Sequence, residues 1–212
     1  MGSDSLHWTE REAEAITSFL SSHDYQVSTH LGRNASSQSF AELVQGRNLI
    51  HLATHAVFNA EDPFQSFLEF GASASHRVQL VDVLGLDLAG STAVLSACST
   101  AETDWKRVFD PVSLTSAFLA AGCHEVLGTL WAVDDSSTAV LMSELYRLVL
   151  DESLSWREAL RRVQLAALRG ETLRPPGVSS ARGPFAQARV STRKTSLTSP
   201  LRWGAFTLSR AM

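Results

Sequence analysis

Residues 48–55 read Asn-Leu-Ile-His-Leu-Ala-Thr-His, and residues 92–98 read Thr-Ala-Val-Leu-Ser-Ala-Cys. Both are short apolar runs of the kind that form buried strands, which we predict over 48–54 and 92–97. His55 and Cys98 therefore come just past the end of a strand. In a parallel sheet with helices on both faces, reactive groups gather beyond the carboxyl ends of the strands. If the two strands are neighbours, this imidazole and this thiol meet at one edge of the sheet.

An imidazole beside a thiol is the arrangement that turns a cysteine into a nucleophile at neutral pH. Cys98 is then the candidate nucleophile, and His55 is the base or the imidazolium of a preformed ion pair. The backbone N–H groups of Ala56 and Cys98 are candidate oxyanion donors. The alternative is structural, because free cysteines are among the most buried residues and a strand-end histidine is often a satisfied core residue. The residues alone leave both interpretations open and assign no third catalytic group.

The rest of the chain alternates between helical and strand patterns. Helical patterns occur over 8–21, 37–44, 80–84, 110–121, 135–150 and 155–169. Further strand patterns occur over 25–30, 67–70, 126–130 and 203–208. Such alternation is typical of an α/β sandwich built on a mostly parallel sheet.

The composition is that of an ordinary globular chain. Its 212 residues suit one domain spanning 1–212, and 44% hydrophobic with 19% charged residues argues against disorder. The net charge of −4 argues against a nucleic-acid binder that works by its overall field. No run approaches the roughly 18 apolar residues that cross a membrane. Two cysteines and no signal-like stretch after Met1 predict a cytoplasmic, reducing location without a structural disulfide.

Residues 171–200 interrupt the alternation of elements. They hold four of the six prolines and five basic residues against the single acid Glu171. This composition predicts a basic, solvated and flexible loop. The alternative is a docking or processing segment, because exposed loops are where proteolytic cuts concentrate.

Polar and aromatic residues near the predicted strand ends are candidates for a substrate pocket. They are Asp62, Ser66, Glu102, Asp104, Asp110, Trp131 and Asp134, with Glu69 a further candidate after His55. The three acids that follow Cys98 would attract a basic substrate side chain, or they belong to a solvated loop. Asp134 is alternatively a helix cap, and Trp131 a core residue.

No metal or cofactor is expected. His51 and His55 share a face of one strand but stand ~13 Å apart, and no second Cys or His pair has the spacing of zinc ligands. A glycine-rich phosphate loop is absent from the sequence, so nucleotide chemistry has no support.

Six blocks of sequence, in order, resemble the CHAT domain, a caspase-like module often joined to TPR repeats. They are His-Leu-Ala-Thr-His at 51–55, Leu-Ser-Ala-Cys-Ser-Thr at 95–100, Ala-Phe-Leu-Ala-Ala-Gly at 117–122, Leu-Trp-Ala-Val-Asp-Asp at 130–135, Ala-Leu-Arg-Arg-Val-Gln at 159–164 and Trp-Gly-Ala-Phe at 203–206. Asp62-Pro63 followed by Ser66 also fits the segment after the family histidine. The likeness runs from about residue 9 to 209.

The resemblance implies a three-layer α/β/α sandwich of the caspase–hemoglobinase type, related to caspases, separase and gingipains. It implies a cysteine endopeptidase without cofactor, with Cys98 as nucleophile and His55 as catalytic histidine. Members are often switched on by a partner or sensor, and their substrates are usually proteins of the same bacterial system, including defence systems. We therefore expect a protein substrate and a TPR-type or sensor subunit as partners, with no nucleic acid or membrane. A catalytically silent scaffold module is the alternative.

The chain departs from the family pattern in three places. Ala56 stands where related proteases commonly have glycine, which keeps the N–H but fits only if the turn does not need a positive φ. Ala-Glu-Thr-Asp-Trp at 101–105 replaces a glycine-rich stretch, and Phe-Asp-Pro at 109–111 replaces a Gly-Glu-Gly-like turn, so substrate specificity is not implied. The family's first strands are expected to be missing, which predicts a part of a larger protein or a sheet completed by a partner.

Overall fold

The computed structural model of the chain describes residues 3–30, 37–59, 61–70, 76–99, 113–171, 173, 197 and 199–211. These residues fall into two compact units. One unit comprises Met1–Thr29 and Val133–Gly204, and we call it the helical unit. The other comprises His30–Ala132 and Ala205–Met212, and we call it the sheet unit.

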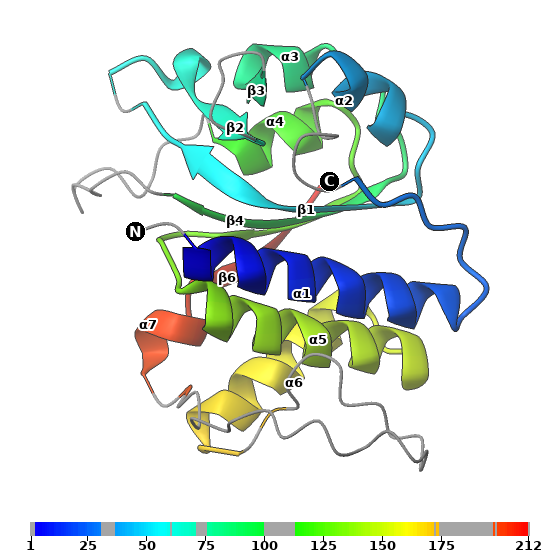
Figure 1. Cartoon of the computed structure of the whole chain (residues 1–212), viewed down its shortest axis with the longest axis vertical. Helices are drawn as coiled ribbons and strands as arrows, with labels where there is room; N and C mark the ends of the chain where they lie inside the picture. Colours follow the sequence, from blue (N-terminus) through cyan, green and yellow to red (C-terminus); the bar gives the residue numbers. More distant parts are fainter. Residues whose placement is uncertain are drawn as a thin grey trace. The chain divides into compact units, whose positions relative to one another are not determined.

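The sheet unit contains one mixed sheet of six strands in the order β3-β2-β1-β4-β5-β6 (Figure 1). The strands are β1 (Leu49–Val57), β2 (Phe67–Glu69), β3 (Arg77–Gln79), β4 (Thr92–Ser99), β5 (Glu125–Thr129) and β6 (Phe206–Arg210). β1, β4 and β5 run parallel at the centre, whereas β2, β3 and β6 pair antiparallel at the edges. The predicted α/β class with a parallel sheet core is confirmed.

Three helices cover one face of this sheet: α2 (Ser37–Val44), α3 (Leu80–Leu84) and α4 (Leu114–Ala120) (Figure 1). Phe40 of α2 and Phe118 of α4 belong to one buried apolar cluster with Leu52 and Leu95 of the central strands. This cluster uses alternate strand residues because successive side chains point to opposite faces of a sheet. Burial of such side chains stabilises the fold by about 1.5–3 kcal/mol each.

The turn from α4 into β5 depends on Gly122. Its φ is +106°, and a Cβ placed there would lie 3.0 Å from the backbone nitrogen of Ala89. Only glycine takes this conformation at so close a backbone approach. The predicted helix stop at Gly122 is therefore confirmed, and Cys123 follows it into the core.

The helical unit contains α1 (Ser3–Ser21), α5 (Asp135–Asp151), α6 (Trp156–Leu168) and α7 (Pro200–Trp203). α1 and α5 pack side by side, and α6 returns along α5 (Figure 1). Tyr146 of α5 is fully buried and meets the ring of Trp156 edge to face, with centroids 5.2 Å apart. Burial raises the pKa of Tyr146, and the charge of Glu12 adds to the effect.

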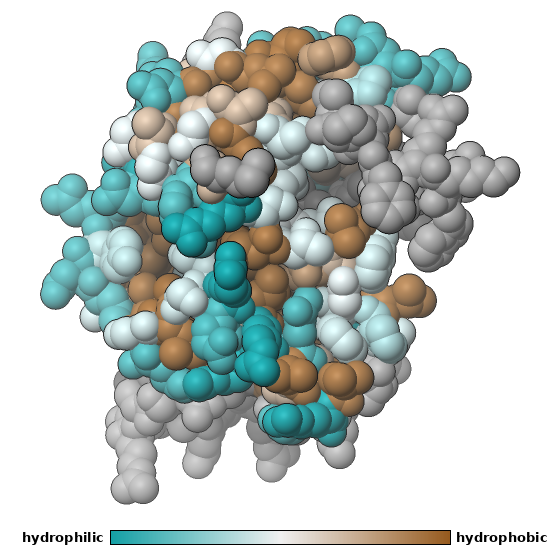
Figure 2. All heavy atoms as spheres, turned by 180° about the vertical axis from the view of Figure 1, so that it is seen from behind, coloured by the Kyte–Doolittle hydropathy of each residue, from teal (hydrophilic) through white to brown (hydrophobic). Residues whose placement is uncertain are grey.

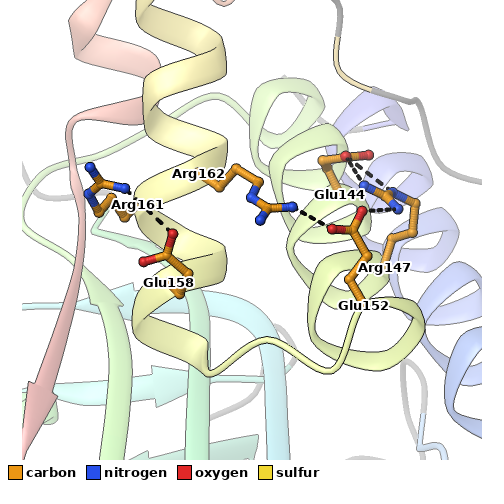
Figure 3. A network of polar contacts seen from close by, with 6 residues as sticks. All are labelled: Glu144, Arg147, Glu152, Glu158, Arg161 and Arg162. Carbon is orange, nitrogen blue, oxygen red and sulfur yellow. Dashed lines mark hydrogen bonds and ion pairs between the residues drawn. The ribbon is translucent and has the colours of Figure 1, made fainter.

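A charged network joins the end of α5 to α6 (Figure 3). Arg147 bonds Glu144 at 2.8 Å and Glu152 at 2.9 Å, and Glu152 also pairs with Arg162. The hydrogen bonds that Arg147 donates to Glu144 hold the pKa of Arg147 above its ordinary value, and the hydrogen bond that it donates to Glu152 lowers the pKa of Glu152. Since the Arg147 and Glu144 side chains are only 17% and 13% exposed, this pair is screened less than an ordinary surface ion pair.

Apolar side chains are also exposed on the sheet unit. Figure 2 shows a hydrophobic group of atoms at the end of the view where α3 lies in Figure 1. Val81 and Leu84 of α3 are 44% and 40% exposed.

Of the described helices, none is long and apolar enough to span a bilayer.

Several predicted boundaries were wrong. Residues 25–30 form no strand, because their side chains are mostly exposed and the Tyr-Val-Thr alternation has no buried face to cover. The last strand begins at Phe206 rather than Trp203, since Pro200 starts the short helix α7 and Gly204 ends it. α4 begins at Leu114 because Ser113 is its N-cap, with its hydroxyl accepting the N–H of Ser116, and the predicted start at Asp110 lies outside the described residues.

Candidate functional site

β1 and β4 bring the backbones of the two predicted catalytic residues side by side. The parallel register pairs His55 with Cys98 and Ala56 with Ser99. Adjacent strands lie about 4.8 Å apart, so these positions are direct neighbours at the carboxyl end of the parallel core. Both residues lie inside their strands rather than past the ends, because β1 continues to Val57 and β4 to Ser99.

β1 is longer than predicted because β2 pairs with its last residues. In this antiparallel register His55 is opposite Glu69, Ala56 opposite Leu68, and Val57 opposite Phe67. The Thr54 hydroxyl also donates to the Glu69 carbonyl at 2.5 Å. The edge hairpin therefore holds His55 in extended backbone instead of a loop.

β3 adds a basic residue beside Glu69. Arg77 is the register partner of Glu69; its Nε donates to Oε1 of Glu69 at 3.1 Å, and its Nη2 forms an ion pair with the same oxygen at 3.0 Å. The Arg77 guanidinium also lies over the Phe67 ring, 4.5 Å from its centre. Such cation–π packing fixes the guanidinium from a second side. Our sequence reasoning missed Arg77, since a three-residue strand carries almost no periodic signal.

Ala56 shows that the missing glycine causes no strain here. Its side chain is buried in the apolar cluster on the helix-covered face. Among the described non-glycine residues, positive φ angles occur at Asp24 and Ser153. Ala56 thus sits in ordinary strand backbone with register partners on both sides, Leu68 and Ser99. Its role as an oxyanion donor, with Cys98, stays a prediction.

Asp62 and Ser66 both stabilise the loop that follows β1. The Asp62 carboxylate accepts the N–H of Phe64 at 3.2 Å and caps the short 3₁₀ helix η2 (Pro63–Gln65). The Ser66 hydroxyl, which is 1% exposed, accepts the N–H of Asn59 at 3.0 Å. Through these contacts, the two residues that were predicted to line a pocket stabilise the loop.

Asp134 caps α5, which is the role that the sequence offered as the alternative to a pocket residue. Its carboxylate accepts the N–H of Ser137 at 3.0 Å and the hydroxyls of Ser136 and Ser137 at 2.6 and 2.7 Å. Burial alone would raise the pKa of Asp134, but these hydrogen bonds and the nearby Arg202 hold it below its ordinary value. Trp131 belongs to the sheet unit and is half-buried just after β5.

The remaining predicted site residues lie outside the described part of the chain. These are Glu102, Asp104 and Asp110, and most of the 171–200 segment lies there as well. Their roles stay predictions. Within the described residues, no group of three His, Cys, Asp or Glu side chains has the arrangement of a metal site.

The second cysteine has an environment unlike a strand end. Cys123 is a free thiol, fully buried at the start of β5 within the apolar cluster. Burial raises its pKa to about 11. Because the thiolate is the reactive species, we expect Cys123 to react slowly at neutral pH.

An open α/β sheet with a parallel core and a His–Cys pair in register at its carboxyl edge fits the caspase-like class of folds. The sequence model of the CHAT domain matches residues 1–211, so this chain belongs to the CHAT domain family, which is related to caspase-like proteases. A search of curated proteins found no match.

Proposed function

We propose that the chain is a cysteine endopeptidase in which Cys98 is the nucleophile and His55 the general acid and base. The observation that carries the proposal is the register of two adjacent parallel strands, in which His55 and Cys98 are direct partners. Membership of the CHAT family supports it independently. Nucleophile and base must be within hydrogen-bond reach, which neighbouring positions on adjacent strands allow.

The reaction follows from these two groups. The Cys98 thiolate attacks the carbonyl carbon of a peptide bond, and backbone N–H groups, for which Ala56 and Cys98 are the candidates, stabilise the oxyanion. The C–N bond then breaks, leaving a thioester on Cys98, while the His55 imidazolium gives its proton to the departing amine. His55 next takes a proton from water, whose oxygen attacks the thioester and releases the acid and the free thiolate.

We propose further that the substrate is a specific protein and that a TPR-type or sensor subunit regulates cleavage, in a bacterial defence or signalling system. Family membership is the support for this part. A reducing cytoplasmic location is supported by Cys123, which is held as a buried free thiol.

Alkylation of Cys98 tests the proposed pair without knowledge of the substrate. We would treat the full chain with iodoacetamide across the pH range and follow Cys98 and Cys123 separately by peptide mass spectrometry. An imidazolium partner should bring the midpoint of the Cys98 rate profile well below the ordinary thiol pKa of about 8.5, and His55→Ala should return it there. His51→Ala is the matched control, because it removes a histidine on the same strand face.

A profile at the ordinary midpoint that His55→Ala does not move would contradict the proposal and favour a silent scaffold.

Cleavage is tested by labelling new N-termini in a bacterial lysate exposed to the chain. Those formed with the wild type should be absent with Cys98→Ala.

A further inference from the structure

Four side-chain types of complementary chemistry occupy one row across the sheet. Cys98 of β4 pairs with His55 of β1, His55 with Glu69 of β2, and Glu69 with Arg77 of β3. The order is therefore thiol, imidazole, carboxylate and guanidinium at successive strand positions. Figure 1 shows β1 and β4 ending on the same side of the sheet unit.

The row lies on the face of the sheet away from α2, α3 and α4. The neighbouring row of Ala56, Leu68 and Val78 is buried in the apolar cluster of those helices. Because successive strand residues alternate between faces, His55 and Glu69 share the opposite face. Directly opposed residues of an antiparallel pair have Cβ atoms about 5 Å apart, so a glutamate side chain at position 69 is long enough to reach the imidazole.

Arg77 determines where the Glu69 carboxylate is held. Its Nε donates to Oε1 of Glu69 at 3.1 Å, and its Nη2 forms an ion pair with the same oxygen at 3.0 Å, so both contacts are made to one of the two carboxylate oxygens. Arg77 is in turn held against the face of the Phe67 ring. Glu69 is thus a carboxylate held through one oxygen, and it stands on the strand next to the one that carries His55.

We propose that Glu69 is a positioning residue for His55, and that it orients the imidazole and stabilises its charged form beside Cys98. The inference rests on the proposed function, in which His55 and Cys98 act together. A third group that orients the base is a common feature of nucleophile–base pairs. The carboxylate accepts one ring N–H, which leaves the other ring nitrogen to carry the proton of the proposed reaction; Glu69 itself neither gains nor loses a proton.

The test uses the full chain and the alkylation profile of Cys98. Glu69→Gln keeps the shape but removes the charge, so the imidazolium–thiolate pair forms less readily in acid. We expect the midpoint of the profile to rise by about one pH unit, which means about tenfold slower alkylation near pH 6 and an unchanged rate near pH 10. Glu69→Asp should keep most of the wild-type profile, since it restores the charge.

Glu61→Gln is the matched control, because it removes the same charge from the exposed loop after β1 outside the row. It should leave the midpoint where it is. A midpoint unchanged in Glu69→Gln, or moved equally by Glu61→Gln, overturns the positioning role. The positioning role is also overturned if Glu69→Gln lowers the alkylation rate of Cys98 equally at all pH values and lowers the melting temperature, because that result indicates a structural role.

His55→Ala separates failure of this inference from failure of the proposed function. If that variant shifts the profile and Glu69→Gln does not, only the role of Glu69 is wrong. If His55→Ala leaves the profile unchanged, the proposed His–Cys pair itself fails.

Discussion

The two cysteines of this chain lie at opposite ends of the same sheet. Cys123 comes before the amino end of β5, where the turn at Gly122 turns the chain into the apolar cluster. Cys98 comes near the carboxyl end of β4, where its register partner is His55. One position surrounds a thiol with hydrocarbon, and the other has a titratable neighbour. The comparison teaches that location along a strand, rather than residue type, decides what a cysteine can do.

The largest expected effect is the difference in reactivity of the two thiols. Near pH 8 a thiol with a pKa of about 11 has about one thousandth of its molecules as thiolate, so Cys123 should react with iodoacetamide at least ~100-fold more slowly than Cys98. Peptide mass spectrometry after timed labelling measures both rates. In guanidinium the two rates should become equal, and comparable rates in the native chain would break the comparison.

A second prediction concerns the turn that buries Cys123. Gly122→Ala forces a Cβ to within 3.0 Å of the Ala89 backbone at a φ of +106°, and we expect a loss of about 2–3 kcal/mol in unfolding free energy. Gly90→Ala is the control: its φ is also positive, at +78°, but nothing lies within 4 Å, so the loss should be about 1 kcal/mol. Urea denaturation followed by circular dichroism compares them.

If the two glycine variants lose the same stability, the close contact at Ala89 does not matter. Gly122→Ala should also speed the labelling of Cys123, because local opening exposes the thiol.

A smaller effect is expected on changing the chemistry of the buried site. Cys123→Ser places a hydroxyl in the apolar cluster and should cost about 1–3 kcal/mol if no acceptor is reached. Cys123→Ala removes the same sulfur without adding a polar group and should cost less. Equal urea midpoints for the two variants would show that a hydroxyl at position 123 carries no burial cost, which would contradict the prediction.

The smallest effect concerns a polar residue whose role is structural. Asp134→Ala removes the cap of α5 and should cost about 1 kcal/mol, whereas Asp134→Asn keeps an acceptor and should cost less. The pKa of Asp134 is lower in the folded state, so its charge stabilises the fold above the unfolded pKa of about 3.9, and this is lost as pH falls through the folded value. Melting temperatures of wild type and Asp134→Asn should therefore converge in acid. A gap that stays constant would contradict this.

Capping residues in the sequence correctly predicted where several helices begin or end. Gly122 ends a helix because of its backbone, Asp134 begins one through its carboxylate, and Ser155 begins α6 in the same way. By contrast, the alternation at 25–30 misled, since a period of two does not say whether a neighbouring strand exists. The start of β6 was also misplaced, because Pro200 and Gly204 made a helical turn out of the preceding residues.

For the candidate site, the sequence singled out His55 and Cys98 through apolar runs and ordered motifs. It did not reveal the cross-strand row, because Glu69 and Arg77 have no fixed spacing from His55 along the chain. Asp62 and Ser66 were predicted to line a pocket, and their side chains accept hydrogen bonds from backbone N–H groups of the loop after β1.

The sequence by itself determined the α/β class, the helix caps and the identity of the residues at two strand ends, because these depend on interactions between near neighbours and on side-chain type. The tertiary structure alone decided that His55 stands between Cys98 and Glu69, and that Cys123 is enclosed in hydrocarbon. Register and burial arise from pairing and packing between segments far apart in the chain. The free energy of these contacts depends on both segments, so the sequence of one segment alone does not determine it.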